Sequence, residues 1–142
     1  MRAESGVVLD VSALIVYARS DMQAMPVDEL LREMREDTGE PLYLPHHAYT
    51  EASWILQDET DALKRLESLA EAHGTRRADD PEAEKVLKLM MSMSGVSLGM
   101  AHAMLLTVAT KSMLATHAAA TLSAAGFEMR KVLDLDEMFR GD

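Results

Sequence analysis

The sequence predicts an α/β domain, a three-layer fold in which a mostly parallel central sheet is flanked by helices. Short apolar runs of strand length alternate with longer helical patterns along the whole chain, which is the order of repeated strand and helix units. The first of these runs, GVVL at residues 6–9, is continuously apolar, as expected for a strand buried on both faces. The 142 residues have the length of one domain, predicted to span residues 1–142.

The first half of the chain carries two predicted strands, each followed by a helix. The strand at 6–9 leads into VSALIVYAR, residues 11–19, which has helical spacing. Pro26 suits the first turn of a second helix, which Gly39 ends. PLYLP, a short strand between prolines, and the helix HHAYTEASWILQ then follow at residues 41–45 and 46–57.

The second half continues the alternation. Residues 61–73 place leucines on one face, as in an amphipathic helix, and residues 75–79 form a possible short strand. Asp80 and Pro81 are typical of a helix start and predict a helix over 81–93. The remaining predicted elements are an apolar central helix at 97–111, a strand at 112–117, a short helix at 118–126 and a last strand at 127–136.

Composition excludes several classes of function. The formal net charge of -10 argues against a dominant phosphate-binding surface, and the small basic pairs Arg76–Arg77 and Arg130–Lys131 are typical of solvated charge. The absence of cysteine excludes disulfides and thiolate metal sites. The sequence has no apolar run of membrane-spanning length and no signal-like N-terminus, so we expect a cytoplasmic protein without membrane contact.

Asp10 directly follows the first predicted strand and is the first candidate for chemistry. Sites in parallel sheets gather beyond the carboxyl ends of the strands, which is where Asp10 lies. Its carboxylate can serve as a metal ligand or can cap the following helix through backbone amides, and the sequence leaves both open. Ser12 suits a local hydrogen bond to Asp10 better than a catalytic role.

Four short motifs, in order, resemble those of PIN domains, the fold of VapC-type toxin ribonucleases. LDVSAL at residues 9–14 resembles the family's Asp-x-Ser-Ala-Leu start, and the segment from Pro45 to Glu51 resembles its Pro-then-Glu helix. SLGMAHA at 97–103 and LATHA at 114–118 resemble its later Ser-Leu-x-Asp-Ala and Leu-x-Thr-x-Asp motifs. The resemblance covers residues 6 to 139 and implies a PIN-like fold.

The resemblance also implies a site, because PIN nucleases gather three or four carboxylates around Mg²⁺ or Mn²⁺. By position, Asp10 and Glu51 match two of the acids, and Ser12 matches the hydroxyl beside the first. Met100 and Ala118 occupy the other two acid positions, so half of the carboxylate cluster is absent.

This pattern implies a degenerate PIN-domain protein without nuclease activity or a bound metal ion, acting through protein–protein interaction or regulation. Its expected partners are a second copy of the chain, in a homodimer, and an antitoxin or other regulatory protein. The alternative is an active VapC-like endoribonuclease toxin. In that case Asp10 and Glu51 would be weak ligands of Mg²⁺ or Mn²⁺, and RNA would be the substrate.

Two histidines adjoin the lost acid positions. His102 and His117 could replace carboxylates if the metal ion were Mn²⁺ or Zn²⁺, although packed histidines are the plainer interpretation. Asp134 and Asp136 could substitute for the lost acid ligands, but they alternate with Leu133 and Leu135, which predicts that both face solvent at the end of the last strand.

Large apolar side chains give a further expectation. Trp54 is the single tryptophan and is predicted to anchor either the core or a dimer interface. Five methionines lie between residues 90 and 104, where helical spacing favours core filling over a partner surface.

Overall fold

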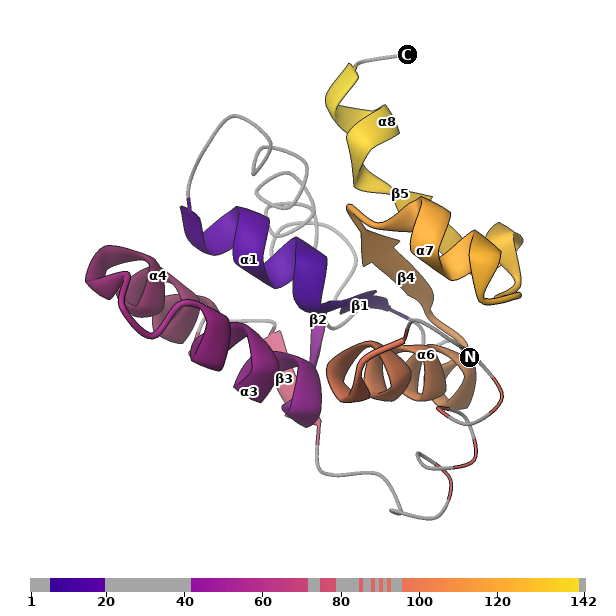
Figure 1. Ribbon diagram of the computed structural model, residues 1–142, viewed down its shortest axis with the longest axis horizontal. Helices are drawn as coiled ribbons and strands as arrows, with labels where there is room; N and C mark the ends of the chain where they lie inside the picture. The colour runs from indigo at the N-terminus through magenta and orange to yellow at the C-terminus, as the bar shows by residue number, and fades with distance from the viewer. Residues whose placement is uncertain are drawn as a thin grey trace.

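The computed structural model describes residues 6–19, 42–71, 75–78, 85, 88, 90, 92 and 96–140 (Figure 1). Strands and helices alternate along the chain, as the sequence predicts. In order, the elements are β1 (Val7–Leu9), α1 (Val11–Arg19), β2 (Leu42–Pro45), α3 (His46–Ile55), α4 (Thr60–Ala70), β3 (Thr75–Ala78), α6 (Leu98–Thr110), β4 (Met113–Thr116), α7 (Ala119–Ala124), a 3₁₀ turn (Met129–Lys131), β5 (Val132–Asp134) and α8 (Leu135–Arg140).

The strands form one five-stranded sheet in the order β3-β2-β1-β4-β5. Each of the four pairings between neighbouring strands is parallel. β1 lies in the centre, where Val7 pairs with Leu42 of β2 on one side and with Met113 of β4 on the other. The predicted α/β class with a parallel sheet flanked by helices is therefore confirmed.

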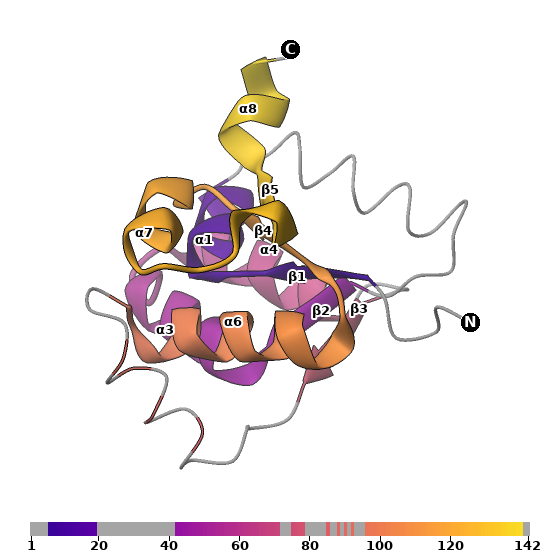
Figure 2. The same cartoon turned by 90° about the vertical axis from the view of Figure 1, so that its right-hand side faces the viewer.

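Apolar side chains leave the sheet on both faces, so two core clusters form. Val7 and Leu9 of β1 pack with residues of α1, α3 and α4, whereas Val8 between them packs with residues of α6 and α7. Figure 2 shows β1 lying between α1 and α6. This period-two alternation in a strand buried on both faces is the arrangement that its continuous apolar sequence predicts.

The carboxyl-terminal segment differs from its prediction. Only Val132–Asp134 of the expected strand at 127–136 is a strand, and the chain enters α8 at Leu135. The physical reason is a helix cap, because the Asp134 carboxylate accepts hydrogen bonds from the backbone N–H groups of Asp136 at 3.0 Å and Glu137 at 3.4 Å. The capped turn stops the sheet pairing and starts a helix.

Three other predictions have different outcomes. Trp54 is 66% exposed, so the expectation that it anchors the core is wrong, and the interface interpretation stays a prediction. The helix expected from Pro26 to Gly39 lies outside the described residues, as does most of the helix expected over 81–93. The described positions of the latter, residues 85, 88, 90 and 92, are helical.

In the part of the chain that the structure covers, no helix is long and apolar enough to cross a membrane.

Candidate functional site

The candidate site lies where the order of the strands reverses. From β1 the chain builds the sheet toward β2 and β3, then returns to the other side of β1 to place β4 and β5. Connections therefore leave β1 and β4 toward opposite edges, and such a switch point is the usual location of sites in parallel α/β sheets. Asp10 follows β1, and His117 follows β4.

Asp10 is completely buried at this point and holds the start of α1. Its Oδ1 atom accepts a hydrogen bond from the Ser12 hydroxyl at 2.7 Å and from the backbone N–H of Ala13 at 2.9 Å. These contacts cap the first turn of the helix, which is one of the two roles that the sequence left open. The second oxygen, Oδ2, is buried and has no hydrogen-bond partner among the described residues.

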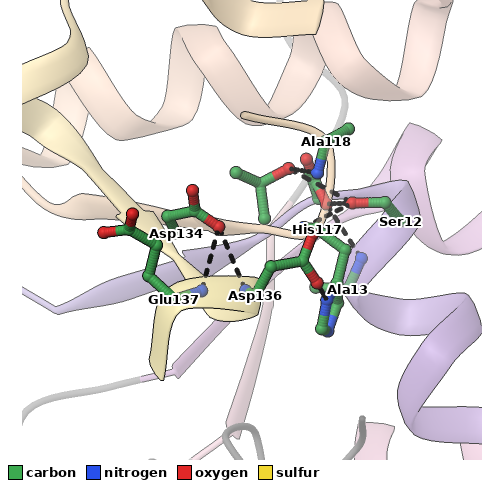
Figure 3. Close-up of polar contacts among 9 residues, drawn as sticks. Ser12, Ala13, His117, Ala118, Asp134, Asp136 and Glu137 are labelled. Carbon is green, nitrogen blue, oxygen red and sulfur yellow. Dashed lines mark hydrogen bonds and ion pairs between the residues drawn. The ribbon is translucent and has the colours of Figure 1, made fainter. Parts of the chain in front are cut away.

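Two hydroxyls connect the end of β4 to the start of α1 (Figure 3). Ser12 Oγ lies 3.2 Å from Thr116 Oγ1 and accepts a hydrogen bond from the backbone N–H of His117 at 2.9 Å. Thr116 Oγ1 accepts a hydrogen bond from the N–H of Ala118 at 2.8 Å. Ser12 thus makes the local contact to Asp10 that the sequence predicts, and it also fixes the turn after β4.

The His117 side chain pairs with Asp136 across 19 residues of sequence. Its Nδ1 atom lies 2.8 Å from Asp136 Oδ1, and the imidazole is 6% exposed whereas the Asp136 side chain is 39% exposed. The prediction that Asp136 lies in a strand is therefore wrong, since it belongs to α8; its carboxylate is partly exposed, as predicted, and also lies against His117. The other ring nitrogen, Nε2, is buried without a hydrogen-bond partner in the described part of the chain.

Burial dominates the electrostatics of Asp10. It raises the pKa of the carboxyl above its ordinary value, because the charged form loses its solvation. The hydrogen bonds from Ser12 and Ala13 lower this pKa, as do the nearby Thr116 hydroxyl and the charge of His117, but these effects are smaller than that of burial. Burial therefore outweighs the neighbouring donors and charge in setting the pKa of Asp10.

Glu51 has a structural contact of its own. Its Oε1 atom accepts a hydrogen bond from the backbone N–H of Gly99 at 2.9 Å, so its carboxylate binds the positive end of α6. A Cβ atom at Gly99 would lie 2.7 Å from this oxygen and 2.7 Å from Cγ2 of Val11, which shows how closely α3, α6 and the start of α1 approach. The structure thus places Glu51 near the residue after Asp10, with its Oε1 bound to α6.

The two positions that lack acids are occupied by packed residues. Met100 is 7% exposed and belongs to the core cluster that includes Val8 and Tyr43. Ala118 packs against the same cluster. Over the described ranges, no group of three or more histidine, aspartate or glutamate side chains is arranged to hold a metal ion.

A second group of imidazoles lies at the start of α3. Nδ1 of His102, a side chain 2% exposed, accepts a hydrogen bond from the backbone N–H of His47 at 3.1 Å. The rings of His46, His47 and His102 follow one another edge to face, with centroids 5.4 and 5.2 Å apart. His102 therefore serves α3 as a buried hydrogen-bond acceptor, which is the packed role that the sequence favours.

Two surface clefts lie away from Asp10. One has a volume of about 260 Å³ and is apolar, formed by α6 and the segment around Phe127. The other has a volume of about 480 Å³ and lies beside the Arg19–Glu59 ion pair, whose charged atoms are 2.9 Å apart. Neither of these two clefts is lined by the acid, hydroxyl and imidazole found at the switch point.

The pairing of Asp136 with His117 was not predicted from the sequence. The signal was present, since Asp134 followed three residues later by Glu137 is a helix-start pattern and breaks the strand interpretation. Thr116 belongs to the LATHA motif, but its contact with Ser12 could not be predicted, because it depends on the pairing of β4 with β1. Its contact with Ala118 forms in the turn after β4.

Comparison with known proteins gives a likeness of fold. No protein-family model matches the chain, and no curated protein matches it. The crystal structure of PAE2754 from Pyrobaculum aerophilum superposes on it with a TM-score of 0.66, covering 96% of each chain at 16% sequence identity. At this identity the likeness shows a shared α/β fold.

Proposed function

We propose that this chain is a degenerate PIN-domain protein that keeps the architecture and the first acid of VapC-type ribonucleases, does not cleave RNA, and acts by binding another protein. One observation carries the proposal. Of the four positions that match PIN acids, Met100 and Ala118 are apolar, and Glu51 binds the first turn of α6 through its Oε1. Asp10 is left without a second carboxylate among the groups that act on its pKa.

The family's Mg²⁺ or Mn²⁺ ions do not fit this set of residues. Such ions need several oxygen ligands in a defined geometry, and clustered carboxylates provide them in two-metal or one-metal nucleases. Asp10 Oδ2 is a suitable single ligand because it is buried without a hydrogen-bond partner among the described residues. The missing oxygens at positions 100 and 118 leave the rest of the coordination shell to water, so no catalytic step is assigned to a hard metal ion here.

The first prediction concerns cleavage. Purified protein incubated with single-stranded RNA and millimolar Mg²⁺ or Mn²⁺ should leave the RNA intact, because activating water and stabilising the developing phosphorane require a held ion. Gel analysis of end-labelled RNA measures this. The Asp10→Ala variant is the matched control, and cleavage that the wild type shows and this variant lacks would overturn the proposal.

Protein binding is supported by a patch of two exposed apolar side chains, Trp54 and Ile55, on α3. Trp54 and Ile55, at the C-terminal end of this helix, are 66% and 45% exposed. A large exposed tryptophan beside an exposed isoleucine is typical of interaction surfaces rather than of scattered surface residues. A second copy of the chain is the first partner that we propose for this patch, and a regulatory protein is the other.

The second prediction tests self-association. The wild-type protein should form a dimer in sedimentation velocity, and Trp54→Ser should weaken dimerisation by about tenfold or more because interface tryptophans are common anchors. Val108→Ser is the matched control, since Val108 is 56% exposed on α6 and its replacement should leave the dimer unchanged. A wild-type monomer at every concentration would contradict the homodimer and leave a foreign protein as the proposed partner.

An active endoribonuclease toxin is the second candidate. The observation that favours it is the free Oδ2 atom of Asp10, the position from which a PIN enzyme would bind its metal ion. This candidate predicts growth inhibition on expression that Asp10→Ala relieves. Normal growth, together with intact RNA in the cleavage experiment, would exclude it.

A further inference from the structure

The apolar cleft beside α6 has the composition of a small ligand site. Its volume is about 260 Å³, and Met104, Leu105 and Val108 of α6 line it together with Phe127. Met104 and Phe127 are buried, whereas Val108 is 56% exposed, so the cleft passes from packed side chains to solvent. Small-molecule sites are mostly apolar, with a few polar groups that fix the orientation of the ligand.

A glycine turn places Phe127 opposite α6. Gly126 follows the end of α7 with a φ of +87°, the left-handed conformation that glycine adopts without strain. The backbone N–H of Phe127 then donates to the carbonyl of Leu122 at 3.0 Å, so the chain folds back and Phe127 joins the core cluster that contains Met104. Gly126 itself lines the cleft, and a Cβ there would have no neighbour within 4 Å. The turn therefore leaves open space beside α6.

One cation at this cleft lacks a counterion. Glu128 and Lys131 both contribute to the lining. The carboxylate of Glu128 forms an ion pair with Arg130, whose side chain is 82% exposed. Lys131 is partly buried, and among the described residues no ion pair or side-chain hydrogen bond includes its ammonium group. In a chain with a net charge of -10, the cleft thus combines an apolar lining with an available positive charge.

We infer that this cleft binds a medium-chain fatty carboxylate, with its alkyl chain against Met104, Leu105 and Phe127 and its carboxylate beside the ammonium group of Lys131. Removal of the alkyl chain from water drives binding, and the positive charge of Lys131 selects a negatively charged end group. The volume of the cleft lies just below the range of about 300 to 1,000 Å³ for drug-sized ligands, so octanoate suits it better than a long acyl chain.

This site is independent of the proposed function. Its lining contains neither Asp10 nor the exposed pair of Trp54 and Ile55. Binding of octanoate can therefore be present whether or not the chain cleaves RNA or forms a dimer.

The test is a titration of the full chain with octanoate, followed by NMR of protein labelled with ¹³C in the methionine methyl groups. The Met104 resonance, assigned with Met104→Leu, should shift in a saturable way. Acetate has the charge without the chain, and octylammonium has the chain with the opposite charge. Each should bind more weakly than octanoate, by about tenfold or more.

Lys131→Glu should weaken octanoate binding about tenfold, because a repulsion between two carboxylates replaces the attraction to the ammonium group. Lys64→Glu is the matched control, since Lys64 is exposed on α4, a helix that packs on the opposite face of the sheet. At that separation the charge is largely screened, so affinity should change by less than about twofold. The unfolding midpoint verifies that both variants fold.

Two kinds of result would overturn the inference. A Met104 signal that octanoate does not shift saturably is the result expected if a segment of a protein partner fills the cleft instead. Octanoate binding that Lys131→Glu leaves unchanged, or octylammonium binding as tight as that of octanoate, would show that Lys131 selects no carboxylate.

Discussion

Gly99→Ala should lower the free energy of unfolding by about 2 kcal/mol, the size expected when a methyl group is forced into packed surroundings. The new Cβ would lie 2.7 Å from Val11 Cγ2 and 2.9 Å from the Cα of Ala48. The second neighbour is backbone, so it cannot move aside by rotating a side chain. The helix-propensity advantage of alanine is at most about 1 kcal/mol and does not offset this overlap.

Urea denaturation at neutral pH measures this loss. Val108→Ala is the matched control on the same helix, because Val108 is 56% exposed and its truncation should change stability by about 0.5 kcal/mol or less. In the Val11→Ala background, Gly99→Ala should cost less than in the wild type, since the Cγ2 atom is then absent and the backbone contact remains. A stability equal to that of the wild type would mean that α3 and α6 separate without cost.

The contact that Glu51 makes could not be predicted from its local sequence, because it depends on the close approach of α3 and α6 at Gly99. A glutamate six residues into HHAYTEASWILQ looks like an ordinary helix carboxylate. Its bond to the Gly99 N–H arises because a residue without a side chain lets α6 pack against α3. Such a contact joins residues 48 positions apart, so no local period reveals it.

The sheet was more predictable than the site. Continuous apolar runs such as GVVL mark strands buried on both faces, and their alternation with helices fixes a parallel sheet. Asp10 could be placed at a strand end for the same reason. The pairing of His117 with Asp136 could not, because it depends on β5 lying beside β4 and on α8 starting directly after Asp134.

Asp10→Asn should raise the free energy of unfolding by about 1 to 3 kcal/mol at a pH above the folded pKa of Asp10, the scale on which a buried charge without a full set of partners destabilises a protein. The Asn side-chain oxygen can keep the hydrogen bonds from Ser12 Oγ and the Ala13 N–H. The substitution removes a buried negative charge whose second oxygen has no partner among the described residues.

The effect of Asp10→Asn on the free energy of unfolding should depend on pH. Burial raises the pKa of Asp10 in the folded protein above its value in the unfolded chain, so the folded state holds the proton more tightly. The contribution of Asp10 to stability therefore falls as pH rises from the unfolded pKa through the folded pKa, and the penalty of the ionised group is complete above the folded pKa. Below the unfolded pKa, where Asp10 is protonated in both states, the advantage of the Asn variant should disappear.

Asp61→Asn provides the matched control, because Asp61 is an exposed acid in the first turn of α4. Its replacement should lower stability slightly at neutral pH, by about 0.3 to 1 kcal/mol, since it loses a favourable interaction with the helix dipole. If Asp10→Asn instead destabilises the protein at neutral pH, the ionised carboxylate stabilises the fold as a cap of α1. If it stabilises, the buried charge of Asp10 costs more than its cap of α1 contributes.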